Sequence, residues 1–397
     1  MKIALAHKRL DLRGGTERVF YRTAVGLRDR GHEIHLFCQK ISMAPPAGVF
    51  AHRVPGLTRP RSLRLLTFGV FAPLFIERFD CDLVVSFDRM IKQDLFRSGG
   101  GPHKVFLDKM QQYVGWWRFL SYKLSPYHRL ALAIEKRQLS SRGSRAIVAV
   151  CEQTKRELIQ AYGTVDDKIT VIHNGVDQDR FHPQNRYGSG QAIRRELGIE
   201  LDKQVILFVG TGFRRKGLHR LLELWKKAML PNAYLVVVGN DTRLAAYKAA
   251  WRNDPHIIFT GARPKVEDFY AAADLLVLPS VQEAFGNVVL EAFAAGLPVV
   301  TVAGVGAMDK VTGELREGIL EDPDNLMELR SRILRFLDPV RWPALSRQAR
   351  QIAEDTTWDN YLDKFEQALI DLCGQMHEES LTAAIAGPKR LGSRPSQ

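Results

Sequence analysis

Residues 274–300 read DLLVLPSVQEAFGNVVLEAFAAGLPVV, and this stretch decides the fold. It begins with an apolar run over 274–280, which has the length of a buried strand. A helical pattern starts near Gly286 and stops at Gly296, before a second apolar run, PVVTV, at 298–302. A strand, a helix and another buried strand in succession are typical of a parallel sheet covered by helices.

The same alternation of short apolar runs and helical stretches fills most of the chain, in two arrays. We predict an α/β fold with two Rossmann-like, doubly wound domains that face each other across an interdomain cleft. Ligands of such sheets bind at the carboxyl ends of the strands, so the cleft is the expected site. The predicted strands are residues 2–7, 32–37, 82–87 and 145–150 in the first array, and 204–210, 233–239, 256–261, 274–280 and 298–302 in the second.

The length of the chain also favours two domains, because 397 residues exceed what one hydrophobic core usually serves. Their boundary is expected in the polar, turn-rich stretch 174–203. We therefore predict an N-terminal domain over 1–174 and a C-terminal domain over 175–354. Residues 357–372 have helical periodicity, and the polar end of the chain, 376–397, is expected to be disordered.

Composition excludes several classes of protein. Hydrophobic residues make up 45% and charged residues 25%, the balance of a soluble globular protein. There is no apolar run of about 18 residues, and the chain opens on a strand pattern rather than a signal peptide, so we expect a cytoplasmic protein. Four cysteines without paired spacing predict neither zinc nor a structural disulfide. They are Cys38, Cys81, Cys151 and Cys373.

A glycine-containing loop joins the first predicted strand to the first helix. Gly14 and Gly15 would let the backbone approach a ligand closely, and free amides at a helix start favour an anion. The loop is neither GxGxxG nor a Walker sequence, which disfavours dinucleotide dehydrogenases and P-loop enzymes. By itself this signal does not separate a phosphate site from an ordinary loop.

A basic loop follows the strand pattern that ends near Gly210. It reads GTGFRRKG and carries Arg214, Arg215 and Lys216 immediately before a helical stretch. Cations at the carboxyl edge of a parallel sheet suit a diphosphate. The alternative is a basic loop that is simply solvated.

Two glutamates, Glu283 and Glu291, flank the start of the helix within the opening stretch. Glu283 falls in the loop after the strand and Glu291 within the helix, so one could bind sugar hydroxyls and the other ribose hydroxyls. Gly286, Asn287 and Val288 form the helix start, a second position that favours phosphate. On their spacing alone, the two glutamates could equally be ordinary residues of a helix surface.

Taken together, these stretches resemble the retaining glycosyltransferases of family 4, which have the two-domain GT-B fold. The similarity is greatest to the lipopolysaccharide core glucosyltransferases that modify the first heptose. It extends from residue 2 to about residue 373, and the run 269–300 is the most specific part. The matching stretches are RGGTERVF, RGHEIHLF, VVSFDRMIKQDLFRSGGG, VIHNGVDQDRF, FVGTGFRRKGLHRLLE, FYAAADLLVLPSVQEAFGNVVLEAFAAGLPVV and the last helix.

The resemblance implies a role for each matching residue around the donor diphosphate. Gly14 and Gly15 would approach the diphosphate, and Arg215 and Lys216 would neutralise its charge. Glu283 would bind the transferred sugar. The configuration at the anomeric carbon would be retained, with the leaving phosphate helping to deprotonate the acceptor.

Further roles implied by the resemblance concern the rest of the donor and the acceptor. Glu291 would bind the ribose, and the backbone from Arg263 to Val266 would meet the base. Asp94 would lie near the acceptor, and it joins Arg215, Lys216 and Glu283 as a candidate catalytic residue. The last helix would cross back onto the N-terminal domain over 355–375.

No metal ion or other obligatory cofactor is expected. Cations and helix dipoles can stabilise the diphosphate that leaves when the anomeric bond breaks. The three DxD triplets fall in positions that indicate structural roles: at the opening of a strand, in the interdomain stretch and in a loop. They begin at Asp80, Asp177 and Asp322.

Residues 104–137 combine basic and aromatic side chains, which suits an interface with anionic lipid. In the family that the chain resembles, this position is a membrane-docking region. The alternative is a pair of helices that bury their aromatics in the core. Such patches also bind nucleic acid, but no nucleic-acid motif accompanies this one. The net charge of +13 fits any of these anionic partners.

We therefore predict a hexosyltransferase that lies at the inner face of the cytoplasmic membrane. The expected donor is a nucleotide-diphosphate sugar, with UDP-glucose favoured, and the expected acceptor is lipopolysaccharide core or a similar glycolipid. Two alternatives stay open: a nucleotide-sugar epimerase of the same fold, and a non-catalytic module that binds nucleotide or membrane.

Overall fold

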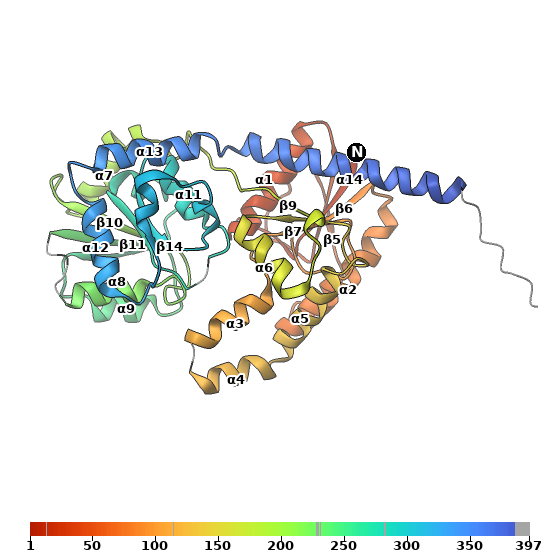
Figure 1. Ribbon diagram of the computed structural model, residues 1–397, viewed down its shortest axis with the longest axis horizontal. Helices are drawn as coiled ribbons and strands as arrows, with labels where there is room; N and C mark the ends of the chain where they lie inside the picture. The colour runs from red at the N-terminus through yellow and green to blue at the C-terminus, as the bar shows by residue number, and fades with distance from the viewer. Residues whose placement is uncertain (13, 114, 228–229, 231, 282, 386–397) are drawn as a thin grey trace, which may run out of the picture.

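The computed structural model describes residues 1–385 except 13, 114, 228–229, 231 and 282. Two α/β bodies lie side by side, each built on a parallel sheet of its own (Figure 1). This arrangement confirms the predicted fold. All nine predicted strands are present, and the strands that were not predicted are short ones of five residues or fewer.

The N-terminal sheet has the order β5-β3-β1-β6-β7-β8-β9, and every neighbouring pair in it is parallel. Its inner strand β1 pairs Ile3 with Ile34 on one side and with Leu83 on the other. All three side chains are buried in the core beneath α1 and α14. The strands are β1 Lys2–Ala6, β3 Glu33–Cys38, β5 Phe50–Arg53, β6 Leu83–Ser86, β7 Leu95–Ser98, β8 Ala146–Ala149 and β9 Ile169–Val171, with a separate pair β2 Arg9–Leu10 and β4 Lys40–Ile41.

Helices cover both faces of this sheet, and three of them, α3 to α5, project below it (Figure 1). The helices of this half are α1 Gly15–Asp29, α2 Arg61–Ile76, α3 His103–Tyr113, α4 Trp116–Leu124, α5 Pro126–Gln138 and α6 Glu152–Tyr162, with short 3-10 turns η1 Glu77–Phe79 and η2 Asp166–Lys168.

The C-terminal sheet has the order β12-β11-β10-β13-β14-β15 and is also parallel. The strand order reverses between β10 and β13, and the crevice at such a reversal is where open α/β sheets bind ligands. The strands are β10 Gln204–Val209, β11 Ala233–Val238, β12 Ile257–Gly261, β13 Leu275–Leu278, β14 Val299–Val302 and β15 Ile319–Leu320. The helices are α7 Ser189–Glu196, α8 Leu218–Lys226, α9 Leu244–Ala250, α10 Glu267–Ala272, α11 Asn287–Ala294, α12 Leu326–Phe336 and α13 Trp342–Glu354, with turns η3 Pro183–Tyr187, η4 Gly306–Met308 and η5 Gly313–Gly318.

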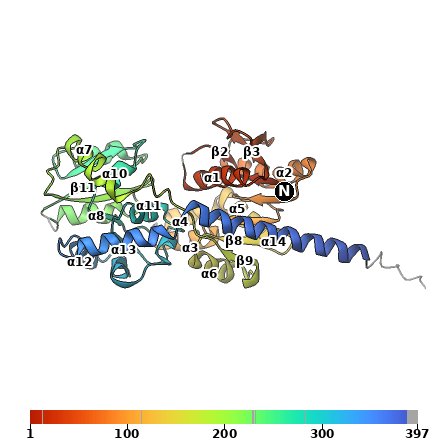
Figure 2. The ribbon, with the colours of Figure 1, turned by 90° about the horizontal axis from the view of Figure 1, so that it is seen from above.

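The last helix, α14 Trp358–Ile385, leaves the C-terminal body and runs along the N-terminal one beside α1 (Figures 1 and 2). Its apolar face is buried in the N-terminal core. The buried residues of that face are Tyr361, Leu362, Phe365, Leu369 and Leu372. Tyr361 also shares a hydrogen bond of 2.9 Å with Thr23 of α1.

Helix α14 corrects the expectation that the chain is disordered from residue 376. It continues to Ile385, because Met376 still packs against the N-terminal core and Glu379 pairs with Arg145. The rest of the expected tail, 386–397, lies outside the described residues. Among the helices that the structure describes, none is both long and apolar enough to cross a bilayer.

Candidate active site

A pocket of about 550 Å³ lies between the two sheets, lined by residues of both domains. From the N-terminal half come the start of α1 and the loop after β7, and from the C-terminal half come the loops after β10, β11 and β13. All of these are carboxyl ends of parallel strands or the helix starts that follow them. Every residue predicted to bind the donor lines this pocket. They are Gly14, Gly15, Arg215, Lys216, Arg263, Val266, Glu283, Gly286, Asn287, Val288 and Glu291.

Two helices begin at the pocket without a capping side chain. Gly14 is the N-cap of α1 and Gly286 is the N-cap of α11, and neither cap makes a side-chain hydrogen bond. Gly286 has φ +77°, a left-handed conformation that glycine adopts readily. The first amides of both helices are therefore available to an anion, and both helix dipoles favour one. Arg13, the first residue of the predicted loop, lies outside the described residues.

The two cations of the basic loop meet a carboxylate from a different strand. Lys216 Nζ lies 3.0 Å from Glu283 Oε2, and an Arg215 nitrogen lies 3.8 Å from the same oxygen. Lys216 is buried, and its chain passes so close to Gly210 that a Cβ there would meet it at 2.3 Å. The glycine after β10 therefore lets the lysine reach the pocket.

Glu291 is the second carboxylate of the pocket, and it is held from both domains. Tyr270 Oη donates to its Oε2 at 2.8 Å, and an Arg18 nitrogen of the N-terminal half lies 4.0 Å from its Oε1. Burial raises the pKa of Glu291, although Tyr270 and Arg18 act against this rise. The burial also raises the pKa of Tyr270, so its hydroxyl stays a donor. A buried acceptor of this kind suits the hydroxyls of a sugar.

Contacts across the cleft include residues that the sequence prediction missed. Asn174 Nδ2 donates to Asn287 Oδ1 at 2.7 Å, and Asn174 in turn accepts from the fully buried Arg97. Gly15 lies against the same Asn287, since a Cβ on it would be 3.1 Å from the amide nitrogen. The HNG sequence after β9 was interpreted as part of the domain boundary and as one of the stretches that match the family, without a role for Asn174. Arg97 falls inside a strand too short and too polar to be recognised.

Arg263 and Val266 lie at the donor-domain end of the pocket, between β12 and α10. Val266 is buried beside the start of α10, and Arg263 is held by Glu196 at 2.8 Å and by the ring of Phe269, 5.6 Å from its guanidinium carbon. These two residues belong to the loop after β12, whereas Arg215 and Lys216 belong to the loop after β10.

Asp94 does not reach the pocket, which corrects the expectation that it lies near the acceptor. It stands just before β7, at the amino end of the sheet, where it accepts from the Val84 amide at 2.8 Å and lies 3.9 Å from Arg145. The four residues of β7 span about 13 Å between this edge and the pocket. The residues from this segment that do line the pocket are Arg97, near the carboxyl end of β7, and Gly99 and Gly100 beyond the strand.

A second recess, of about 360 Å³, opens from the N-terminal side of the pocket. The two share a wall made of Thr16, Arg97, Gly99, Gly100 and Phe106. We call this space the side recess. His103 lines it and is buried. Its ring is 2.9 Å from that of His128, and burial, together with Arg89, lowers its pKa to about 3.

The acidic triplets contact protein groups, and none of their aspartates is among the described residues that line the pocket between the sheets. Asp82 accepts from the Lys2 amide at 2.7 Å, Asp177 lies 3.0 Å from Arg22, and Asp324 lies 2.7 Å from Arg220. Each carboxylate thus has a structural contact at the position where the sequence suggested one.

Two family models match nearly the whole chain. The model described as Glycosyltransferase Family 4 matches residues 13–180, and that described as Glycosyl transferases group 1 matches residues 189–354. The lipopolysaccharide glucosyltransferase WaaG of Escherichia coli is 28% identical over 352 residues, which cover 86% of this chain and 91% of that protein. This chain belongs to the family 4-type glycosyltransferases.

This glycosyltransferase also resembles other members and solved structures. A D-inositol 3-phosphate glycosyltransferase of Mycobacterium avium is 27% identical over 390 residues, which cover 88% of this chain and 87% of that protein. The crystal structure of WaaG superposes with a TM-score of 0.77 at 24% identity, covering 91% of this chain and 98% of that one. Anabaena HepE in complex with UDP-glucose gives a TM-score of 0.69 at 18% identity, covering 94% of this chain and all of that one (100%). The structural likenesses show the GT-B fold.

Proposed function

We propose that this glycosyltransferase transfers a hexose, with glucose favoured, from a nucleotide-diphosphate sugar to lipopolysaccharide core or a similar membrane glycolipid. One observation carries the proposal: Arg215, Lys216 and the start of α11 converge with Glu283 and Glu291 in a single pocket between the sheets. The names of two relatives favour glucose, since WaaG is a glucosyltransferase and HepE was crystallised with UDP-glucose.

The charges of the pocket match a diphosphate leaving group. When the bond between the anomeric carbon and the β-phosphate oxygen breaks, negative charge develops on that phosphate. Lys216 and Arg215 are placed to stabilise it, and the uncapped start of α11 adds aligned amides. Before the donor binds, Glu283 forms ion pairs with both cations. The diphosphate of the donor would replace Glu283 as the partner of Lys216. The glutamate would then be free to accept hydrogen bonds from the hydroxyls of the sugar.

Transfer with retention is the course that this arrangement favours. Among the described residues that line the pocket, the carboxylates are Glu283 and Glu291. The first is paired with Lys216 and the second is engaged by Tyr270, so neither is presented as a free nucleophile. In the proposed step the acceptor oxygen bonds to the anomeric carbon on the face that the diphosphate leaves, and the acceptor proton passes to the leaving phosphate.

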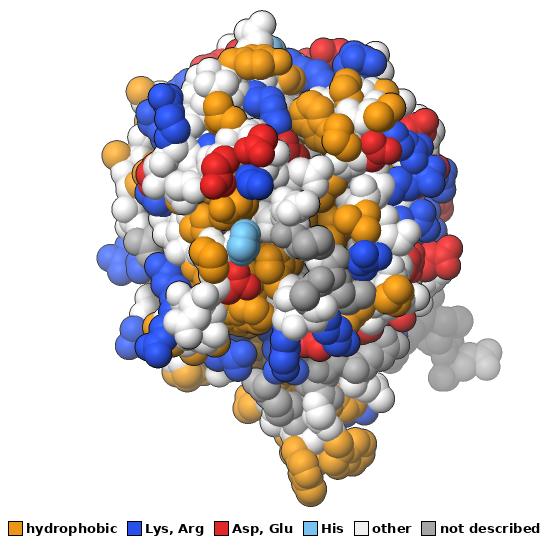
Figure 3. Space-filling view, turned by 90° about the vertical axis from the view of Figure 1, so that its left-hand side faces the viewer, with side chains coloured by type: hydrophobic (Ala, Val, Ile, Leu, Met, Phe, Trp, Pro, Cys, Tyr) orange, Lys and Arg blue, Asp and Glu red, His pale blue; other side chains and the backbone are white. Residues whose placement is uncertain are grey.

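Contact with a membrane is proposed for the projection made by α3, α4 and α5. Trp116, Trp117 and Leu124 of α4 are exposed by 67%, 79% and 66%, which is unusual for such large apolar side chains. The space-filling view shows hydrophobic side chains at the lowest tip of the molecule, where Figure 1 places this projection (Figure 3). Trp and Leu beside cations suit the interface of an anionic bilayer. The side chains of Tyr113 and Arg118, which belong to the same predicted stretch, lie outside the described residues.

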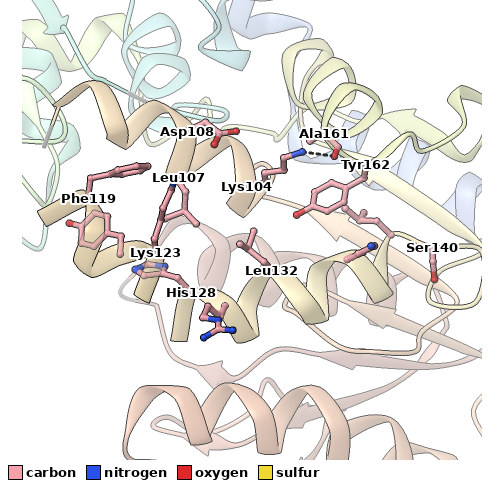
Figure 4. Close-up of a pocket in the computed structure, with 14 residues that line it drawn as sticks. Lys104, Leu107, Asp108, Phe119, Lys123, His128, Leu132, Ser140, Ala161 and Tyr162 are labelled. Atoms are coloured by element: carbon pink, nitrogen blue, oxygen red, sulfur yellow. Dashed lines mark hydrogen bonds between the residues drawn. The ribbon is translucent and has the colours of Figure 1, made fainter. Parts of the chain in front are cut away.

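An apolar cavity of about 680 Å³ behind α4 adds to this proposal (Figure 4). Phe119 and Leu132 line it from α4 and α5, and Lys104 donates across it to the carbonyl oxygen of Ala161 at 3.2 Å. Lys123 lies on its rim over the Phe119 ring at 4.8 Å. An apolar interior with cations at the rim fits a surface that meets anionic amphiphiles at the inner face of the membrane.

Transfer from UDP-[¹⁴C]glucose to a lipopolysaccharide acceptor that lacks the outer core tests this function. We expect label in the glycolipid and release of UDP in equal amounts, with the new bond in the same anomeric configuration as the donor by NMR. Conversion of the donor to another hexose without acceptor would instead support the epimerase alternative. Binding of the donor with no turnover would support the non-catalytic one.

A further inference from the structure

The side recess leads away from the donor pocket into a narrow cationic recess of about 50 Å³. The two recesses share five lining residues, none of which lines the donor pocket, so the cationic recess lies at the opposite end of the side recess. The shared residues are Lys8, Arg61, Asp88, Arg89 and Tyr127. Its volume suits a small group better than a sugar ring.

The charge of the cationic recess is unbalanced. Lys8, Arg61, Arg64 and Arg89 line it against a single carboxylate, Asp88. Lys8 is paired with Asp88 at 2.7 Å, and Arg89 reaches Glu135 at 3.4 Å. The Nε of Arg89 is buried and has no hydrogen-bond partner among the described residues. Among the described residues that line the recess, two further guanidinium groups therefore have no carboxylate of their own.

Those two groups are Arg61 and Arg64, which lie in the first turn of α2. Arg61 rests on Tyr127, with its guanidinium carbon 4.0 Å from the ring centre. Arg61 and Arg64 line the same recess, and burial together with the neighbouring Arg9 and Arg61 lowers the pKa of Arg64. The start of α2 has no acidic residue and no capping side chain.

Stability does not account for this arrangement. A helix start carries partial positive charge and favours acidic residues, yet α2 begins with two arginines. Like charges gathered at a concave surface instead indicate a ligand of opposite charge, which would relieve their repulsion. The guanidinium groups are also the side chains best suited to bind planar or tetrahedral anions with two hydrogen bonds.

We propose that the cationic recess binds an anionic group of the acceptor, a carboxylate or a phosphate, and so selects acidic glycolipids as acceptors. This inference rests on the proposed function and names the acceptor class for the same site. The anion would anchor the acceptor at one end of the side recess, while the hydroxyl that receives the sugar lies at the other end, beside the donor pocket.

The proposal is tested by measuring transfer to acceptors whose phosphates or carboxylates have been neutralised. The wild-type enzyme is compared with the double variant Arg61→Gln/Arg64→Gln. The control is Arg142→Gln, an exposed residue in the loop before β8, at the other edge of the sheet. Each enzyme is given the native glycolipid, a sample dephosphorylated with hydrofluoric acid, and a sample whose carboxylates are methyl-esterified. The measurements are KM for the acceptor, KM for UDP-glucose and the melting temperature.

We expect the double variant to raise KM for the native acceptor about tenfold or more, as loss of hydrogen bonds to a charged group implies. KM for UDP-glucose should not change, and the melting temperature should change little, because the removal of like-charge repulsion offsets the loss of the contact between Arg61 and Tyr127. For the wild-type enzyme, neutralising the group that binds should raise KM by a similar factor. The same treatment should have no further effect on the double variant, and the treatment that acts identifies carboxylate or phosphate.

Wild-type transfer that is indifferent to both treatments would overturn this inference alone, as would a double variant that behaves like Arg142→Gln. Absence of wild-type transfer to all three acceptors would overturn the proposed function, and this inference with it.

Discussion

Lys216 Nζ lies 3.0 Å from Glu283 Oε2, although the lysine follows β10 and the glutamate follows β13. The two loops meet because β10 and β13 are neighbours at the point where the strand order reverses. The pair is thus a product of topology, and it places a cation and a carboxylate where a sugar diphosphate would need both.

Replacement of Lys216 should slow catalysis strongly. We expect Lys216→Met to lower kcat by about 10²–10³-fold, the loss typical of removing one preorganised group that stabilises developing negative charge. Lys226→Met, at the exposed end of α8, is the control and should change little. Steady-state kinetics with UDP-glucose decide the matter. Equal kcat values for the two variants would show that Lys216 does not stabilise the leaving group.

Glu291→Gln should separate donor binding from stability. Because burial opposes ionisation of Glu291, the free protein should lose little stability when the carboxyl becomes an amide. A hydroxyl of the donor would lose a charged acceptor, so the dissociation constant of UDP should rise about tenfold. Calorimetric titration measures this, with Glu267→Gln, which pairs with Arg180, as control. If the dissociation constant of UDP is the same for Glu291→Gln and the wild type, Glu291 does not bind the ribose.

Gly239, after β11, should not tolerate a side chain. Its φ is +134°, and a Cβ would stand 1.8 Å from the Gly210 carbonyl oxygen. We expect Gly239→Ala to lower the free energy of unfolding by about 1–3 kcal/mol from backbone strain alone. The contact of the new Cβ with the Gly210 carbonyl oxygen would add to this loss. Gly374→Ala is the matched control, because its Cβ meets open space within α14 and should stabilise by up to about 1 kcal/mol. Melting temperatures that shift in the same direction for both variants would contradict this account.

Acid should destabilise the protein in part through His103. The unfolded chain takes up this proton near pH 6.5, whereas the folded protein holds the pKa of His103 at about 3. His103 therefore makes its full contribution to the free energy of unfolding above pH 6.5. That contribution is lost as the pH falls below 6.5, by at most about 1.4 kcal/mol per pH unit. His103→Gln should flatten the dependence of the melting temperature on pH between 5 and 7. A slope identical to that of the wild type would refute the effect.

Membrane contact through α4 should depend on its exposed tryptophans. We expect Trp116→Ser/Trp117→Ser to sediment less with vesicles that contain phosphatidylglycerol, while transfer to a detergent-dispersed acceptor is retained. Val340→Ser, which removes an exposed apolar residue at 87% exposure in the other domain, should sediment like the wild type. If all three proteins sediment equally, the projection is not the docking surface.

The strands, and the loops that line the interdomain pocket, were predictable because their signals are local. A buried parallel strand is a continuous apolar run, and the loops at residues 210–217 and 283–291 follow such runs directly. Placing those loops in one pocket requires only that carboxyl ends of parallel strands share an edge. Residues that act through partners distant in sequence gave no such signal. Asn174, in the loop after β9, donates to Asn287, and Arg97 of β7 donates to Asn174.

The position of Asp94 could not be predicted from the matching motif, because a motif does not give the position of its residues in the sheet. The stretch that matched the family ran from β6 through β7 to the glycines, and the sequence did not say which edge of the sheet its aspartate would occupy. The length of β7 separates the amino end of the sheet, where Asp94 lies, from the carboxyl end, where the pocket lies. The length of α14 was underestimated for a related reason, since Met376 and Glu379 are held by residues of the N-terminal domain far away in sequence.

A crystal structure with UDP-glucose bound is the most direct test of the central claim that a sugar diphosphate lies between the two sheets. We expect its diphosphate to contact Arg215, Lys216 and the first amides of α11, with the ribose at Glu291 and Lys216 released from Glu283. A nucleotide bound outside the interdomain pocket, or one whose diphosphate leaves the Lys216–Glu283 pair intact, would contradict the account.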